Sequence, residues 1–98
     1  MVQDIYIRLK ENMDIESFYQ KIKSSYEEND KVRFIFDTSG SNVNISDMNK
    51  VKQVFDKLEK LTEIKLEETC IIVDGEVKKK IISAFVQSIK QKKPVRIL

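Results

Sequence analysis

The chain has 98 residues, of which 41% are hydrophobic and 35% charged, and its formal net charge is +2. This length supports one hydrophobic core and excludes two independent ones, so we expect one domain over residues 1–98. No apolar run approaches the roughly 20 residues of a membrane span, and the first ten residues lack the apolar segment of a secretory signal. We therefore expect a cytoplasmic protein without a transmembrane segment.

Several kinds of catalytic chemistry lack their residues in this chain, which has no histidine and one cysteine. The missing histidine excludes mechanisms that use imidazole as a base or a ligand. A single cysteine excludes a CxxC redox pair and a thiolate zinc site, and no GxxxxGK[ST] or GxGxxG phosphate loop is present. We expect neither enzymatic activity nor a cofactor, and we expect Cys70, inside an apolar run, to be a buried hydrophobic residue.

The first predicted element is a strand over residues 5–9, where apolar residues alternate with polar or less apolar ones. Because one face is less apolar, this strand is expected at an edge of the sheet. Asp14 then caps a helix that ends near Asn29. Its apolar stripe contains Ile15, Phe18, Tyr19, Ile22 and Tyr26.

Residues 32–36 form a short, nearly continuous apolar run, which predicts a central strand covered on both faces. The turn-forming residues 38–44 make the longest loop, and Ser46 is placed to cap the following helix. The apolar stripe of that helix continues to Leu61.

A second buried strand is predicted over residues 67–73, a last helix from Val77 to Ile89, and a closing edge strand over residues 94–98. The sequence thus predicts a small α/β domain with four mostly parallel strands alternating with three helices, joined by right-handed crossovers that put helices on the sheet's faces. An exposed edge strand permits pairing between copies, so we expect a monomer or a weak dimer.

Basic residues are concentrated at the C-terminal end, since residues 77–98 contain seven of them and no acid. Such a segment attracts anionic lipid or nucleic acid, although lysine-rich helix faces often contact only solvent. The candidate anion-binding residues are Lys78, Lys79, Lys80, Lys90, Lys92, Lys93 and Arg96.

Asp37 and Asp74 each follow a predicted strand, and ligands of open parallel sheets collect beyond the carboxyl ends of strands. Two neighbouring carboxylates there are suited to hold Mg²⁺ or to share a raised pKa, as in a magnesium-dependent enzyme. The alternative is that each aspartate has only a structural role, because aspartate commonly ends a strand and starts a turn.

The loop after the central strand carries several hydroxyl groups. A phosphate on Ser46 would lie at a helix N-terminus, where an anion is stabilised by about 0.3 to 1 kcal/mol. The alternative is that these residues only form the loop and the helix cap.

The order of these segments resembles the STAS domain of bacterial anti-sigma factor antagonists. The resemblance lies in the layout of Ile5-Tyr6-Ile7-Arg8-Leu9, Phe34-Ile35-Phe36-Asp37 and a helix opening at Ser46, followed by Ile71-Ile72-Val73-Asp74 and another helix. It covers nearly the whole chain, without the family's extra first strand and its full C-terminal helix, so both chain ends look trimmed.

STAS domains carry Asp-Ser-Ser-Gly at the start of the second of these helices, where a partner kinase phosphorylates a serine. Here the corresponding stretch reads Ile45-Ser46-Asp47-Met48, with Asp47 at the phosphoacceptor position, where a fixed negative charge would mimic the modified state. The resemblance implies a regulatory module that binds a protein partner. The candidate partner-binding residues are Thr38, Ser39, Ser41, Asn42, Ser46, Asp47 and Lys50.

The layout is also similar to the C-terminal part of CRAL-TRIO lipid-binding domains, with residues 34–37, 71–73, 81–85 and 94–97 at the corresponding places. Those domains are longer and close over their lipid with a helical lid. This second resemblance implies a related fold, with an anionic lipid or nucleic-acid surface binder as the alternative function.

Overall fold

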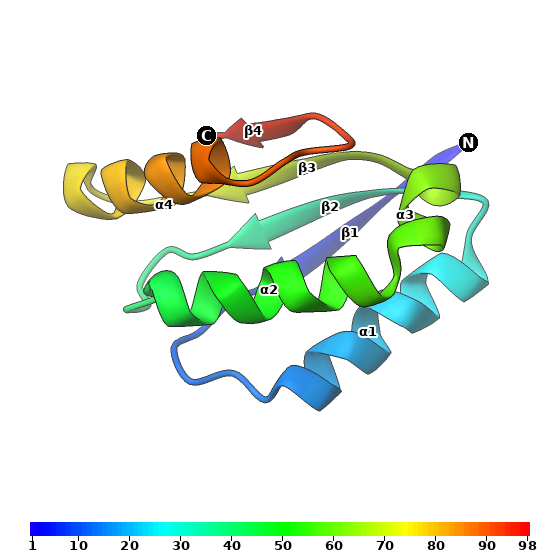
Figure 1. Ribbon diagram of the computed structural model, residues 1–98, viewed down its shortest axis with the longest axis horizontal. Helices are drawn as coiled ribbons and strands as arrows, with labels where there is room; N and C mark the ends of the chain where they lie inside the picture. Colours follow the sequence, from blue (N-terminus) through cyan, green and yellow to red (C-terminus); the bar gives the residue numbers. More distant parts are fainter.

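The computed structural model describes all 98 residues and consists of a parallel sheet with helices between its strands. The strands follow the order β1-β2-β3-β4 across the sheet, and every neighbouring pair is parallel (Figure 1). This confirms the predicted α/β fold with four parallel strands. The elements are β1 (Val2–Arg8), α1 (Ile15–Glu28), β2 (Lys31–Asp37), α2 (Ile45–Lys57), α3 (Glu59–Lys65), β3 (Leu66–Ile72), α4 (Glu76–Ser88) and β4 (Val95–Ile97).

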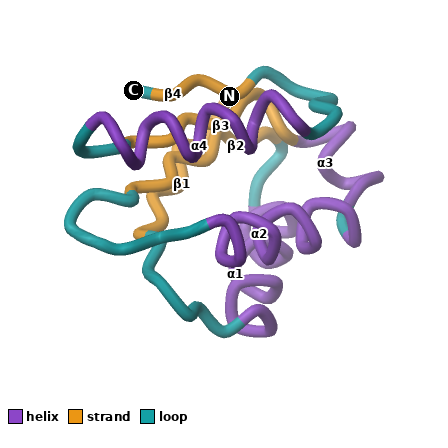
Figure 2. The backbone as a smooth tube through the Cα atoms, turned by 60° about the vertical axis from the view of Figure 1, so that its left-hand side comes forward, coloured by secondary structure: helices purple, strands orange, loops and turns teal.

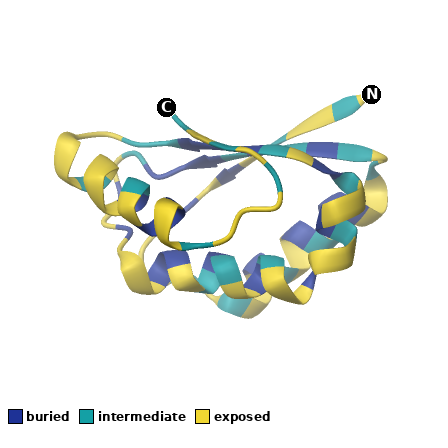
Figure 3. Ribbon diagram, turned by 45° about the horizontal axis from the view of Figure 1, so that its top comes forward, coloured by how far each residue is buried: buried dark blue, intermediate teal, exposed yellow.

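All the helices cover the same face of the sheet. Each crossover advances by one strand in the same direction, and crossovers of one hand then place every helix on one side. Figure 3 shows α1, α2 and α4 together on one side of the sheet, and α2 contacts both α1 and α4 (Figure 2). The expectation of helices on both faces, and of a doubly covered β2, is therefore wrong.

Alternate residues of β2 explain this one-sided arrangement. Val32, Phe34 and Phe36 are buried toward the helices, whereas Arg33 and Ile35 are only partly covered on the open face. The nearly continuous apolar run in the sequence hides this alternation because Ile35, on the open side, is also apolar.

Ion pairs occupy much of the open face. Arg33 bridges two strands, with its Nη1 atom 2.9 Å from Asp4 and its Nε atom 2.8 Å from Glu68. Arg96 on β4 extends the row, with Nη2 2.9 Å from the same glutamate oxygen. These charged side chains stand where a second helical layer would require apolar ones, so the open face is compatible with water.

The core between the sheet and the helices is rich in aromatic side chains. Phe34 stacks on Phe36 with ring centroids 5.6 Å apart, and Tyr26 approaches Phe34 edge-on at 5.5 Å. Phe55 from α2 packs against both phenylalanines. Cys70 is buried, as expected. None of the four helices has the length and apolar composition of a membrane span.

The structure has four helices where the sequence predicted three, because the expected helix ending at Leu61 is broken. Leu58 leaves the helical region with φ −105° and ψ 27°, and α3 starts immediately after it. The bend places Thr62 beside Tyr26, whose hydroxyl lies 2.8 Å from the threonine hydroxyl in the core. A tertiary contact, not a helix-breaking residue, therefore accompanies the break.

Asp14 caps α1 as predicted, but Ser46 does not cap α2. The helix begins earlier, and Asn44 is its N-cap: the Asn44 side chain accepts a hydrogen bond from the Asp47 backbone N–H at 3.1 Å. The Asp47 carboxylate in turn accepts one from the Asn44 N–H at 3.1 Å. This reciprocal pair is a capping box with Asp in the third helical position.

Candidate functional site

The candidate site is the carboxyl edge of the sheet, where β2 and β3 end and where α2 and α4 begin. Because the strands are parallel, the loop after β2 and the N-termini of both helices meet at this edge, at the left in Figure 1. This is where the sequence places Asp37, Asp74 and most of the predicted partner-binding residues.

Asp37 is held by groups from β1 and from the following loop. Its Oδ1 atom accepts hydrogen bonds from the Ser39 N–H at 2.9 Å and the Ser39 hydroxyl at 2.6 Å. The Tyr6 hydroxyl donates to Oδ2, and Arg8 lies 3.7 Å from the same oxygen. The Ser39 hydroxyl above all, then Tyr6 and the Ser39 N–H, lower the pKa of Asp37 from 3.8 to about 2.

Asp74 has a cation and a donor of its own. Lys78 lies 2.5 Å from one carboxylate oxygen, and the Gly40 N–H donates to the other at 2.9 Å. The bond from Lys78, followed by the one from Gly40, lowers the pKa of this carboxyl group. Lys78 also donates a hydrogen bond to the Thr38 carbonyl oxygen at 2.7 Å, and this bond connects α4 to the loop after β2.

Asp37 and Asp74 therefore flank the same turn, each with its own partners. The hypothesis of a shared, raised pKa is wrong, because both pKa values are lowered. No group of three or more acidic, histidine or cysteine side chains is positioned to hold a metal ion. The arrangement matches the ordinary alternative, in which each aspartate ends a strand and orders the turn after it.

The predicted loop residues Thr38 and Ser41 point inward. Their hydroxyls connect the loop after β2 to the C-terminal ends of β1 and β3. The Thr38 hydroxyl donates to the Ile72 carbonyl oxygen at 2.8 Å, joining the loop to the end of β3. The Ser41 hydroxyl bonds the Leu9 carbonyl oxygen at 3.0 Å, joining it to the segment after β1. Both side chains are buried, so their role is to fix the loop.

Asp47 and Lys50 likewise face the segment between β1 and α1. Asp47 is 2% exposed, and its carboxylate accepts a hydrogen bond from the Asn12 N–H at 2.9 Å in addition to capping α2. Lys50 donates to the Met13 carbonyl oxygen at 3.1 Å. The carboxylate of Asp47 is thus engaged inside the fold and does not stand on the surface in place of a phosphate.

Of the predicted partner-binding residues, Asn42 and Ser46 are exposed, and Ser39 and Lys50 are partly exposed. Apolar side chains that the sequence reading did not assign accompany them. Ile45 at the start of α2 is 44% exposed, and Val77 at the start of α4 is 75% exposed.

A signal for these apolar side chains is present in the sequence of α4. Val77, Ile81 and Ala84 follow the helical spacing i, i+4, i+7, and they lie about 100° around the helix from the buried residues Ile82 and Phe85. All three are exposed, so α4 carries a wider apolar arc than its packing against the sheet requires.

The seven candidate anion-binding residues do not form one surface. Lys78 is engaged with Asp74, Lys92 pairs with Glu59 and Glu63 of α3, and Arg96 lies on the open face of the sheet. The side chains of the remaining four make no ion pair or hydrogen bond: Lys79 and Lys80 on α4, and Lys90 and Lys93 in the segment that leads to β4.

Comparison with known proteins gives no match, since no family model fits the chain and neither a curated protein nor a solved structure is significantly similar to it. The fold and the site geometry are therefore the basis for a functional proposal.

Proposed function

We propose that this chain is a non-enzymatic module that binds a protein partner at the carboxyl edge of its sheet. The observation that carries the proposal is the exposure of Ile45 and Val77 at the N-termini of two neighbouring helices. Exposed apolar side chains with polar neighbours, here Asn42 and Ser46, are typical of the centre and rim of a protein interface.

The rigidity of this edge supports the proposal. The polar side chains of this edge are hydrogen-bonded within the fold: the hydroxyls of Thr38 and Ser41 and the carboxylates of Asp37 and Asp74. No buried side-chain polar atom in the protein lacks a partner. A surface that is already ordered loses little conformational entropy when a partner docks on it, which favours binding.

The resemblance to STAS domains favours a regulatory role for such binding. Ser46 is exposed in the first turn of α2, so a phosphate on its hydroxyl would add negative charge next to Ile45. In this proposal the modification changes partner affinity by altering the charge of the docking surface.

The test combines partner capture with matched surface variants. The wild-type protein is immobilised, captured proteins are identified by mass spectrometry, and the recovered partner is purified for calorimetry. We expect Ile45→Ser and Val77→Ser each to weaken binding at least tenfold, because apolar anchors dominate interface energies. The control is Ile64→Ser on α3, which removes a 64% exposed apolar side chain away from the carboxyl edge.

Circular dichroism checks that all three variants keep the wild-type fold. The proposal is contradicted if purified partner binds the Ile45 and Val77 variants with wild-type affinity, or if the Ile64 variant loses binding equally.

A further inference from the structure

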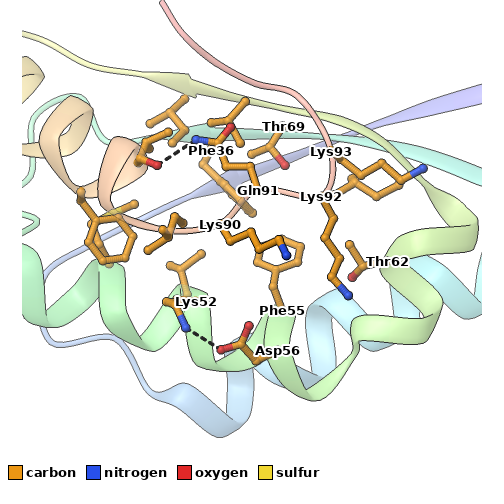
Figure 4. A pocket seen from close by; sticks show the side chains of 18 of the residues that line it. Phe36, Lys52, Phe55, Asp56, Thr62, Thr69, Lys90, Gln91, Lys92 and Lys93 are labelled. Atoms are coloured by element: carbon orange, nitrogen blue, oxygen red, sulfur yellow. Dashed lines mark hydrogen bonds and ion pairs between the residues drawn. The ribbon is translucent and has the colours of Figure 1, made fainter.

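A second feature of the helical side of the sheet lies apart from the carboxyl edge. A cavity of about 230 Å³ opens between α2 and the segment that joins α4 to β4, with the sheet as its floor (Figure 4). More than half of its 19 lining residues are hydrophobic. Phe36 and Ile71 lie at the floor, Phe55 on the α2 side, and Phe85 and Ile89 on the α4 side.

The inner wall has few polar side chains, and of these the Thr69 hydroxyl makes no hydrogen bond within the protein. The Thr62 hydroxyl is bonded to Tyr26, and the Gln91 amide donates to the Val86 carbonyl oxygen at 2.8 Å. A ligand in this cavity therefore has to be apolar along most of the part that it buries, because a polar group away from Thr69 would lose its hydrogen bonds to water without replacement.

The mouth of the cavity is positively charged. Four lysines and two acids are among the lining residues, which gives a formal charge of +2. Both acids are neutralised internally, since Lys52 lies 2.8 Å from Asp56 and Lys92 pairs with Glu59.

Two of the lining lysines have no partner inside the protein. Lys90 and Lys93 make no ion pair or hydrogen bond, and in Figure 4 the Lys90 side chain extends across the mouth from the side opposite Lys52. An apolar interior under an unpaired cation selects a ligand with an apolar chain and a single anionic head.

We propose that this cavity binds a medium-chain amphipathic anion, with its chain against Phe55 and Phe85 and its head at Lys90. The size follows from comparison with a dry cavity of about 150 Å³, which holds the six carbons of benzene. The cavity of about 230 Å³ accordingly holds about nine non-hydrogen atoms, close to an eight-carbon chain with a carboxylate at the opening.

The first experiment titrates the protein with octanoate and follows backbone amide signals by NMR. We expect saturable shifts at the lining residues, and we expect octyltrimethylammonium, which has the same chain and the opposite charge, to bind at least fivefold more weakly. Hexanoate should bind about tenfold more weakly than octanoate, because two methylene groups fewer are buried. Octyl phosphate, compared at equal chain length, shows whether the site prefers a carboxylate or a phosphate head.

Variants separate the charged mouth from the apolar interior. Lys90→Gln should lower octanoate affinity about two- to fivefold, as expected for a partly solvated ion pair, and leave octanol binding unchanged. Its control is Lys79→Gln, which removes an exposed lysine of α4 outside the cavity. Ile89→Trp fills the opening and should abolish binding, whereas Ile64→Trp places the same ring on an exposed position outside the cavity and should not.

Any one of three results would overturn the inference. The first is octanoate binding that is matched by the cationic amphiphile, which would show that charge does not select the ligand. The second is octanoate binding that survives Ile89→Trp, and the third is the absence of saturable shifts at the lining residues. None of these results bears on protein binding at the carboxyl edge, which is tested separately.

Discussion

Asp37 shows how one side chain at the end of a strand orders its surroundings. Its carboxylate is bonded to Tyr6 of β1 and to Ser39 of the loop, so it joins the edge strand to the turn after β2. The sequence placed an aspartate here, but it did not reveal these partners. Tyr6 is 31 positions away along the chain and is brought close by the parallel pairing of β1 with β2.

Because the folded pKa of Asp37, about 2, lies below its ordinary value of 3.8, its ionised form is favoured by folding. The stabilisation is therefore present above about pH 4 and is lost as the pH falls toward 2. We expect Asp37→Asn to lower the free energy of unfolding at neutral pH and to reduce its decline between pH 4 and pH 2. Urea denaturation at a series of pH values measures both effects. Asp30→Asn, at an exposed position, should leave the curve unchanged.

At the scale of the element, the N-cap of α2 is Asn44, whereas residue types alone predicted Ser46. Both Asn44 and Ser46 are good N-cap residues, and the choice depends on where the helix starts. Asp47 decides it, because its carboxylate bonds the Asn44 N–H and the Asn12 N–H from another segment at the same time. That second bond exists only in the folded chain.

Substitutions at Asn44 and at Ser46 distinguish which of the two residues is the N-cap of α2. We expect Asn44→Ala to lower the free energy of unfolding by about 1 kcal/mol, the usual loss for a missing N-cap. Ser46→Ala should change it by less than about 0.5 kcal/mol, as for an exposed position without a structural role. Urea denaturation followed by circular dichroism measures both, and an equal loss in the two variants would contradict the assignment of Asn44 as the cap.

At the scale of the whole molecule, the one-sided arrangement divides neighbouring residues of a strand between a core and a water-exposed face. Phe34 contacts Tyr26, Phe36 and Phe55, whereas Ile35 lies beside Tyr6 and Cys70 on the face without helices. The binding proposals both concern the helical half of the molecule, since the open face is occupied by bridging ion pairs.

Alanine substitutions in β2 test this division. Phe34→Ala should cost about 3 to 5 kcal/mol, as for a fully buried aromatic residue, and Ile35→Ala should cost about 1 to 2 kcal/mol because that side chain is only partly buried. Urea denaturation measures the difference. If Phe34→Ala does not fold, Phe34→Leu replaces it and should still cost more than Ile35→Ala. Equal costs at the two positions would contradict a core on one side only.

The sequence alone determined the alternation of strands and helices, the parallel pairing and the edge position of β1. These follow from local apolar spacing and from the lengths of the crossovers. It also indicated the carboxyl edge, because Asp37 and Asp74 each follow a strand.

Tertiary structure alone decided which side the helices cover, where the second helix breaks, and which polar residues face inward. Each depends on contacts between residues far apart in the chain: Arg33 with Glu68, Tyr26 with Thr62, and Asp47 with Asn12. A local pattern shows that a side chain is polar or apolar. Whether that side chain is bonded within the protein or remains free to bind a ligand depends on contacts between distant segments. Burial and hydrogen bonding are properties of the assembled layers.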